Sequence, residues 1–356
     1  MKKNMIATSV VAALALPVTA DAAKVLGDKL EIYGKLHVSI DASDRDDPSV
    51  TAKEDISVSE NSSRFGVKGK HKIGDSGLSV VYKLEQGVNI SGTGGTFATR
   101  NSYVGLKGSF GQVIVGHHDT PFKTVGSKWG VFGDSVGERR AVLGAGATGG
   151  NTMNQRGRNA LMWSNKIAGA KVMAMYATDA GDSSATSPDN NDLAMFSVGV
   201  LYKSKNSPFY FGAAFEDWDM LKGSATDGFR IMGGYKGDFG KVGVIYEDIS
   251  ASANADLDRS VYGVNGVFKL SKGLDIRGQV LIADDYKGVA NSGATKVGVG
   301  LYKKLDKKTK IYAVYAQTDN DTNAQYQAVD GGHGDEVKTA LGGTPNSFSV
   351  GMEYKF

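Results

Sequence analysis

The sequence contains no cysteine in its 356 residues, and proline is rare, with 6 residues. The absence of cysteine excludes disulfide frameworks, thiol nucleophiles and cysteine-ligated zinc sites. Low-complexity or disordered chains are normally rich in both proline and glycine. Here glycine is common, with 48 residues, but it lies among β-branched and aromatic residues, as in YVGLKG and VGVGLY. This composition is typical of strands in a bent, twisted sheet rather than of linkers.

Long apolar runs are missing beyond the N-terminus. The chain starts with two lysines after Met1, followed by an apolar stretch that a proline interrupts, and then by alanines at an A-x-A spacing that ends at Ala22. This pattern predicts a secretory signal peptide over residues 1–22 and an exported chain over residues 23–356. No later run is long enough for a transmembrane helix, which excludes a helical membrane protein.

Signals for nucleic acid, cofactors and catalysis are also lacking. The chain has 41 Lys and Arg against 38 Asp and Glu, which gives no argument for a nucleic-acid partner. The stretch GAGATG at 144–149 matches a nucleotide-binding pattern, but it lacks a proper preceding strand and a following helix. In HHD at 117–119 the adjacent histidines would point to opposite faces of a strand, so a shared metal is geometrically awkward. No histidine lies in a recognisable nucleophile motif, so we predict no enzyme, cofactor or metal site.

What the chain does have is a period-two alternation of apolar and polar residues. Apolar side chains occupy positions 348, 350, 352, 354 and 356, and the residues between them are charged or small. The same pattern recurs along the whole exported chain and predicts sixteen strands. They are expected at 30–40, 62–71, 77–88, 99–108, 111–117, 157–166, 170–179, 193–203, 208–218, 228–237, 241–250, 260–270, 273–284, 295–304, 309–319 and 346–356.

The connections between these strands alternate between short and long. The long polar ones are expected at 42–61, 118–155, 180–192 and 320–345. A soluble sandwich also alternates, but it needs Greek-key crossings, whereas strands of about ten residues joined by simple hairpins are typical of membrane barrels. We therefore predict an all-β fold over 23–356, a closed antiparallel 16-stranded transmembrane β-barrel with its apolar side chains toward lipid and its polar ones toward water.

Aromatic residues recur near the ends of the expected strands. In a membrane barrel such residues form girdles at the two interfaces with water. The tyrosines expected in these girdles are Tyr33, Tyr82, Tyr103, Tyr176, Tyr202, Tyr235, Tyr246, Tyr302, Tyr315 and Tyr354.

Cations are expected on the inner face of the N-terminal strands. Each alternates with an apolar neighbour that should face outward, as Lys35 does with Leu36. In a water-filled channel such side chains keep their hydration and set the local field. The alternative is that each only forms a salt bridge with a neighbour or lines a wide vestibule. The expected basic wall consists of Lys35, Arg64, Arg100, Arg156 and Arg158.

The longest connection, 118–155, is rich in glycine and carries Asp134 and Glu138 four residues apart. A loop of this length in a compact fold is usually functional or disordered. If it folded back into the barrel, its carboxylates would face the basic wall and narrow the hole. Opposed charges across such a constriction would create a transverse field that favours polar solutes.

The motifs SRFGVKG, KLEQGV and TRNSYVGLKGSFGQVIVGHHDTPFKT, with the terminal aromatic, resemble the general porins of Gram-negative outer membranes. The resemblance implies a trimeric porin whose third outer loop folds inward and opposes a basic cluster on the wall. By position in these motifs, Arg64, Arg100 and Arg156 match that cluster, and Lys35 matches the first-strand lysine. Asp134 and Glu138 are the expected loop carboxylates.

The resemblance also implies partners and a location. We expect a homotrimer in the outer membrane, in contact with lipid and lipopolysaccharide, and passive diffusion of small hydrophilic solutes and ions. Phe356, after Tyr354, is similar to the terminal signal that the barrel assembly machinery recognises. A solute-selective, anion-preferring channel is the alternative, because Arg139, Arg140, Arg230 and Arg277 would permit it. A purely structural barrel plugged by its loops is the third possibility.

Overall fold

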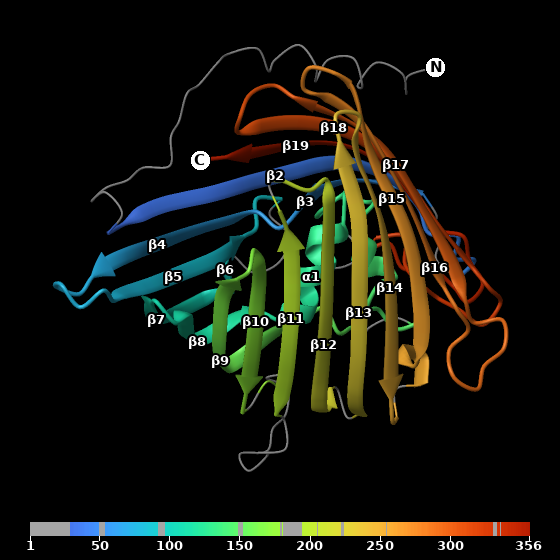
Figure 1. Cartoon of the computed structure of the whole chain (residues 1–356). Coiled ribbons are helices and arrows are strands. Elements are labelled where there is room, and N and C mark those ends of the chain that lie inside the picture. Colours follow the sequence, from blue (N-terminus) through green and yellow to red (C-terminus); the bar gives the residue numbers. More distant parts are fainter. Residues whose placement is uncertain are drawn as a thin grey trace.

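The chain forms a closed antiparallel β-barrel with one helix, α1, inside the ring of strands (Figure 1). This computed structural model describes residues 29–49, 54–91, 97–148, 152–178, 180, 194–204, 206–221, 224–253, 255–329, 333–334 and 336–356. The signal peptide expected at 1–22 lies outside the described residues.

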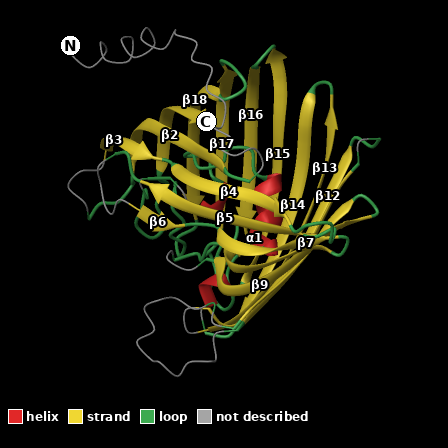
Figure 2. Ribbon diagram, turned by 90° about the vertical axis from the view of Figure 1, so that its left-hand side faces the viewer, coloured by secondary structure: helices red, strands yellow, loops and turns green. Residues whose placement is uncertain are grey.

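The barrel is built from long strands joined by hairpins, as Figure 2 shows from a second direction. The strands are β2 (Glu31–Asp44), β3 (Glu54–Glu60), β4 (Arg64–Lys72), β5 (Ser79–Val88), β6 (Phe97–Thr99), β7 (Ser102–Gly108), β8 (Gly111–Asp119), β9 (Arg156–Ile167), β10 (Ala170–Ala177), β11 (Met195–Lys203), β12 (Phe209–Leu221), β13 (Ser224–Gly237), β14 (Gly240–Ala251), β15 (Arg259–Ser271), β16 (Leu274–Ala283), β17 (Ala294–Lys304), β18 (Thr309–Asn320) and β19 (Asn346–Lys355). The helical elements are α1 (Pro121–Trp129), η2 (Arg139–Ala141) and η3 (Ala255–Leu257).

Consecutive strands pair with each other, and β19 pairs with β2 to close the ring. Both β3 and β4 pair with β2, and both β6 and β7 pair with β5, so each of these two couples occupies a single place in the ring. The barrel is therefore 16-stranded, as predicted. Closure gives every strand two neighbours and leaves no edge with unpaired amides.

One expected loop contains a strand. Residues 42–61 were predicted to be a polar connection, but Glu54–Glu60 form β3 and pair with the second half of β2. Ile56 and Val58 face outward and are 79% and 59% exposed. The prediction was wrong because this short strand has only two apolar residues. It forms because β2 is long enough to offer a pairing partner beyond β4.

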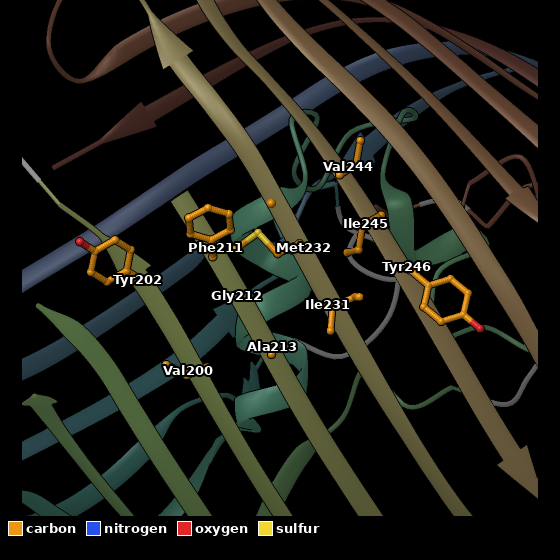
Figure 3. Close-up of a pocket in the computed structure, with 11 residues that line it drawn as sticks. Val200, Tyr202, Phe211, Gly212, Ala213, Ile231, Met232, Val244, Ile245 and Tyr246 are labelled. Atoms are coloured by element: carbon orange, nitrogen blue, oxygen red, sulfur yellow. The ribbon is translucent and has the colours of Figure 1, made fainter. Parts of the chain in front are cut away.

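The outer face of the barrel is apolar. Val200, Phe211, Ile231 and Val244 line a shallow groove across β11–β14 (Figure 3). Towards the short turns, aromatic rings continue from strand to strand with centroids 5.4 to 6.5 Å apart. This band consists of Tyr202, Phe211, Phe209, Tyr235, Phe239 and Phe268. Within the described part of the chain, no helix is long and apolar enough to cross a bilayer.

Three tyrosines expected in the aromatic girdles face inward instead. Tyr33 donates a hydrogen bond to Glu85, and Tyr302 is 1% exposed under the guanidinium of Arg277. Tyr103 alternates with outward Val104 and contacts the ring of His118. Position in the alternation decides whether a tyrosine faces inward or outward. The residue type does not decide it, because tyrosine suits a polar lumen as well as a membrane interface.

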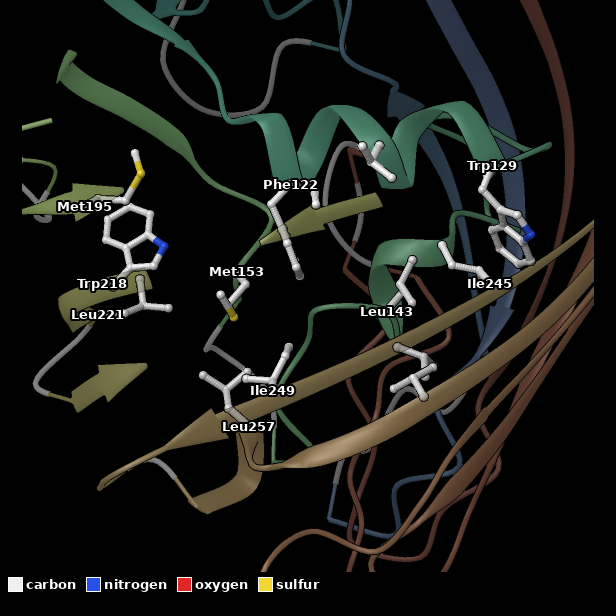
Figure 4. Packing of buried hydrophobic residues seen from close by; sticks show 14 of the residues in the cluster. Phe122, Trp129, Leu143, Met153, Met195, Trp218, Leu221, Ile245, Ile249 and Leu257 are labelled. Carbon is white, nitrogen blue, oxygen red and sulfur yellow. The ribbon is translucent and has the colours of Figure 1, made fainter. Parts of the chain in front are cut away.

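The inner face is polar in one sector and apolar in another. On β2 the inward residues Lys35, His37, Ser39, Asp41 and Ser43 are all polar and buried. On β9–β13 many inward residues are instead apolar, and α1 packs against β10–β14 from inside (Figure 4). They include Met162, Met173, Met175, Met195, Ala214 and Met232.

The apolar sector corrects the expectation that polar residues line the whole interior. Phe122 and Trp129 of α1 are fully buried among its residues, so a hydrophobic core lies inside the barrel rather than outside it. Strands covered on both faces need apolar residues on both. Unbranched methionine suits this sector because its flexible side chain fills irregular gaps between a helix and a sheet.

The short turn between β13 and β14 depends on a glycine. Gly240 has a φ of +138°, and an added Cβ would lie 1.8 Å from the backbone oxygen of Val267. We expect Gly240→Ala to destabilise the barrel by about 1–3 kcal/mol, because alanine rarely adopts this conformation and the neighbouring backbone cannot yield. Urea unfolding in detergent micelles, followed by heat-modifiable gel migration, measures the change.

Gly278→Ala is the matched control, since nothing lies within 4 Å of a Cβ built there and its φ is ordinary. Equal urea midpoints for the two variants would contradict the assignment of strain to Gly240.

Candidate functional site

The segment between β8 and β9 begins with α1. The hydroxyl oxygen of Thr120 accepts a hydrogen bond from the backbone amide of Lys123 at 3.1 Å, and Pro121 follows as the first helical residue. Both features are standard at helix N-termini. The helix ends at Trp129, and the chain continues without regular structure except for the turn η2.

Polar side chains of β13 and β15–β16 hold the backbone of this segment. They donate hydrogen bonds to carbonyl oxygens of the segment. The bonds are Arg230 to Phe122 at 3.0 Å, Asn265 to Trp129 at 2.9 Å, Arg277 to Val131 at 2.8 Å, Arg259 to Val142 at 2.9 Å and Gln279 to Gly137 at 3.2 Å. An irregular segment buried in a barrel needs such donors, because an unpaired buried carbonyl is costly.

A buried ion cluster anchors the same segment. The Nε of Arg230 donates to Glu247 at 2.8 Å, and Arg259 lies 3.9 Å from the other oxygen of this carboxylate. That oxygen also accepts the backbone amide of Gly144 at 2.6 Å. Arg230 is 0% exposed, so it is not available to solutes, contrary to the suggestion that it permits anion preference. Removing one partner of such a cluster would leave a buried charge unpaired.

In the middle of the segment, Asp134 contacts residues of β2 and β4. Asp134 Oδ2 lies 2.8 Å from Lys35 Nζ and 4.0 Å from Arg64 Nη2, and its Oδ1 lies 2.9 Å from Arg140. Asp134 has a φ of 59°, in the sparsely populated left-handed region. The side chain of Asp134 is 20% exposed, so water reaches this meeting of charges.

Glu138 has a different environment from Asp134. One oxygen accepts the backbone amide of Asp134 at 2.8 Å, and the other pairs with Arg139 at 2.5 Å and Arg140 at 3.1 Å. Glu138 is only 1% exposed. It therefore shapes the turn that presents Asp134, whereas Asp134 faces the wall.

Arg100 of the expected wall also has a carboxylate partner. Arg100 Nε lies 2.9 Å from Glu85, which also receives Lys83 at 2.9 Å and the Tyr33 hydroxyl at 2.8 Å. Sequence reasoning missed Glu85, although it alternates with outward Leu84 and so has the parity of the inner face.

A second carboxylate, Asp119, was also missed. It lies 3.2 Å from Arg156 and 3.1 Å from Lys123. It occupies the last position of β8, immediately before the chain turns into α1. Since Asp119 comes directly after two histidines, the sequence drew attention to metal binding instead. No group of three or more His, Cys, Asp or Glu residues that could hold a metal occurs among the described residues.

Arg158 lies at an irregularity. Gly116 pairs with Ala160 but His118 pairs with Gly157, so two residues of β9 oppose one residue of β8. The alternation from which Arg156 and Arg158 were expected to share a face is interrupted by this β-bulge. Arg158 is exposed, and its place in the basic wall remains a prediction.

The connection between β18 and β19 also reaches the inner wall, which the sequence did not indicate. Tyr326 is 1% exposed and accepts a hydrogen bond from Arg259 at 2.9 Å. His333 lies 3.0 Å from Asp41 of β2. The backbone amide of Gln325 donates to the carbonyl oxygen of Ala147, in the segment between β8 and β9, at 2.7 Å. Two connections therefore contact each other beside the inner wall.

The C-terminal residue has a packing partner. Phe356 exchanges backbone hydrogen bonds of 3.1 and 3.2 Å with Gly34, and its ring stacks on Tyr354 at 6.1 Å. An added Cβ on Gly34 would meet this ring. The terminal aromatic therefore covers the seam where β19 joins β2. The recognition of Phe356 and Tyr354 by assembly machinery remains a prediction.

Burial and neighbouring charges shift the pKa values of two groups in the segment between β8 and β9. Burial disfavours the charged form of Asp134, but Lys35 and Arg140 outweigh it and hold the pKa of Asp134 below its usual range. Burial lowers the pKa of Lys123 to about 8 although Asp119 opposes the shift, so Lys123 is still mostly protonated at neutral pH.

Comparisons with known proteins agree with this architecture. A family model described as Gram-negative porin matches residues 7–324. The major outer membrane protein P.IB of Neisseria gonorrhoeae is 33% identical over 127 residues, which are 36% of this chain and 35% of that protein. The P.IB protein of Neisseria meningitidis serogroup A is 29% identical over 143 residues, 38% of this chain and 40% of that protein. The match thus covers well under half of these curated relatives.

Solved structures share the fold over nearly their whole length. The anion-selective porin from Comamonas acidovorans has a TM-score of 0.73 at 18% identity, covering 92% of this chain and 99% of that chain. A trimer form of OmpT from Vibrio cholerae has a TM-score of 0.67 at 18% identity, with the same coverages of 92% and 99%. At these identities the likeness concerns the fold.

The contact between Asp134 and Lys35 generates a prediction about loop docking. We expect Asp134→Asn to loosen the segment by about 1–3 kcal/mol at pH 7, because Lys35 is nearly buried and would lose its charge partner. The folded-state pKa of Asp134 is lowered, so its contribution is complete above the ordinary aspartate range and is lost as the pH falls through the lowered value. The rate of tryptic cleavage after Arg139 and Arg140 in detergent micelles measures the loosening.

The control is Glu336→Gln, since Glu336 pairs with Lys338 at 3.8 Å and both side chains are more than half exposed. Wild-type protein should resist trypsin equally before and after a brief exposure to pH 5. An unchanged cleavage rate in Asp134→Asn would refute the docking role.

Proposed function

Because the chain belongs to the Gram-negative porin family, we propose that it forms a water-filled channel in the outer membrane of a Gram-negative bacterium. Small hydrophilic solutes and ions would cross this channel by passive diffusion. The segment between β8 and β9 acts as the inward-folded third outer loop and narrows the channel. The constriction lies between the basic wall, with Lys35, Arg64, Arg100 and Arg156, and the loop carboxylate Asp134.

The observation that carries this proposal is the position of Asp134. The segment starts at β8, is held by donors of β13–β16, and brings Asp134 within 4.0 Å of cations on β2 and β4. Charges from the loop and the wall thus meet where Asp134 and Arg64 stay partly exposed, at 20% and 25%, beside the nearly buried Lys35. Ions and dipolar solutes that pass here experience a transverse field, whereas apolar solutes would have to displace hydration without compensation.

An anion-preferring channel is the second candidate, and the local charge balance favours it. The cations near Asp134, Glu138, Glu85 and Asp119 outnumber these carboxylates. They are Lys35, Arg64, Lys83, Arg100, Lys123, Arg139, Arg140 and Arg156. An excess of positive charge in a narrow passage raises the local anion concentration. The anion-selective porin from Comamonas acidovorans has the same fold, which supports this candidate.

We also propose the partners of the channel. A homotrimer is supported by the trimer form of the Vibrio cholerae protein of the same fold. The apolar belt of the barrel, including the groove of Figure 3, would contact outer-membrane lipid and lipopolysaccharide. The barrel assembly machinery would recognise Phe356 and Tyr354 at the end of β19.

Recording of ion currents through the purified protein in planar bilayers tests the proposal. We expect an ohmic conductance step and, in a potassium chloride gradient, a reversal potential that indicates anion preference. Arg64→Ala with Arg100→Ala should lower the anion-to-cation permeability ratio about fivefold, the effect of roughly 1 kcal/mol from two charges in an aqueous passage.

Lys272→Ala with Lys307→Ala is the matched control, because both lysines are exposed in short turns and the net charge changes equally. An equal shift of the reversal potential in both double variants would exclude the constriction assignment. The absence of any conductance from correctly folded protein would instead support a structural barrel plugged by its loops.

A further inference from the structure

Lysines face each other across several hairpins at the short-turn end of the barrel. Each pair lies directly opposite in the strand register, and alternation places both members on the inner face. The pairs are Lys68 and Lys83 on β4–β5, Lys166 and Lys171 on β9–β10, Lys236 and Lys241 on β13–β14, and Lys304 and Lys310 on β17–β18. Like charges directly opposite each other destabilise a strand pair unless something compensates them.

Carboxylates compensate the pairs on one side of the ring. Lys68 lies 2.9 Å from Glu31, and Lys83 lies 2.9 Å from Glu85. Lys310 of the β17–β18 pair lies 3.2 Å from Glu353. Lys304 has no such partner among the described residues, so carboxylates compensate the β4–β5 pair fully and the β17–β18 pair only in part.

The pairs on β9–β10 and β13–β14 differ. Within the described ranges, no carboxylate lies within 4.0 Å of Lys166, Lys171, Lys236 or Lys241. The nearest carboxylate in sequence is that of Asp238 in the turn between Lys236 and Lys241, and it is exposed. Lys166, Lys171 and Lys236 are exposed and Lys241 is half-buried, so their ammonium groups are accessible to a ligand.

Two further lysines extend this positive region. Lys128, at the C-terminal end of α1, is close enough to Lys171 to act on it electrostatically. Arg277, Lys236 and Lys203, at the end of β11, act in the same way on Lys241, but Arg277 is paired with Asp275 at 2.6 Å. We call Lys128, Lys166, Lys171, Lys203, Lys236 and Lys241 the turn-end lysine cluster. It comes from α1 and from strands β9, β10, β11, β13 and β14. α1 contacts β10, β11, β13 and β14, and β9 pairs with β10.

We propose that the turn-end lysine cluster binds small oligovalent anions, with inorganic phosphate and pyrophosphate as the simplest members of the class. Opposed residues of a strand pair have Cβ atoms about 5 Å apart, and lysine stems are long and flexible, so two ammonium groups can contact one anion. A monovalent anion would neutralise only one lysine of a pair, whereas pyrophosphate can neutralise both. The anion takes the place that Glu31, Glu85 and Glu353 occupy elsewhere in the ring.

This inference rests on the proposed function, since the anion must reach the inner face through water. Short turns face the periplasm in bacterial outer-membrane barrels, which puts the cluster at the periplasmic mouth. The phosphate group of an anionic lipid has the same chemistry, but lipid contacts the outer face, and these lysines have the parity of the inner one.

Isothermal titration calorimetry of pyrophosphate into the purified protein in an uncharged detergent tests the proposal. We expect saturable binding that Lys166→Gln, Lys171→Gln, Lys236→Gln and Lys241→Gln together weaken about tenfold, because each anion then loses the ammonium groups that contact it. The matched control carries Lys68→Gln, Lys83→Gln, Lys310→Gln and Lys355→Gln, which remove equal charge from lysines that each lie within 4.0 Å of a carboxylate, and should bind nearly as well as wild type.

Equal weakening in both variants, or no saturable binding to wild type, would overturn the proposal. If the quadruple variant fails to give the heat-modifiable band of a folded barrel, Lys236→Gln with Lys241→Gln serves instead, with Lys68→Gln and Lys83→Gln as its control. Calorimetry does not need a conducting channel, so a silent bilayer recording and a missing binding site are separate failures.

A second titration distinguishes the source of the phosphate group. Phosphatidylglycerol or phosphatidylcholine is added to the micelles before pyrophosphate. An unchanged pyrophosphate affinity in both supports an aqueous site on the inner face. Displacement of pyrophosphate by phosphatidylglycerol alone would assign the lysines to a lipid headgroup and overturn the proposal.

Discussion

The need to satisfy backbone hydrogen bonds shapes both layers of this molecule. In the wall, closure of β19 onto β2 gives every strand a neighbour on each side, which a sheet surrounded by lipid requires. Inside the wall, the irregular segment after α1 cannot satisfy itself. Arg277, Gln279 and Arg259 therefore donate to its carbonyl oxygens from the barrel. The inner polar residues thus serve partly as hydrogen-bond donors to a loop, and only some of them are free to face a solute.

This division of labour explains why cations at similar depth have different roles. Arg230 is fully buried between Glu247 and the backbone of α1, so its charge fixes the segment in place. Arg64 and Asp134 remain partly exposed, so their charges act on a passing solute, and the nearly buried Lys35 pairs with Asp134 beside them. The apolar, methionine-rich sector under α1 has the same origin, because a helix that packs inside the barrel needs an apolar surface on the wall.

Alternation in the sequence predicted the number of strands and most of their positions, because one face of each strand must be apolar over its whole length. It failed where another contact decides the outcome. β3 pairs with a long β2, Tyr33 and Tyr302 turn inward to Glu85 and Arg277, and a bulge interrupts the alternation before Arg158. Asp134 was singled out because carboxylates in a long loop are conspicuous, and Lys35 and Arg64, which it contacts, were expected on the inner face by parity. The donors from β13–β16 were not expected, because a sequence does not say which carbonyl oxygens they will reach.

Apolar side chains of the barrel strands face lipid, and the polar side chains that alternate with them face water. The absence of cysteine allows a direct test with single introduced cysteines on two paired strands. Val67 pairs with Leu84, and Lys68 pairs with Lys83, in the register of β4 and β5. In proteoliposomes, a charged thiol reagent should label Lys68→Cys and Lys83→Cys quickly and Val67→Cys and Leu84→Cys slowly. Labelling at one rate in all four positions, or faster labelling at Val67 and Leu84, would contradict the account.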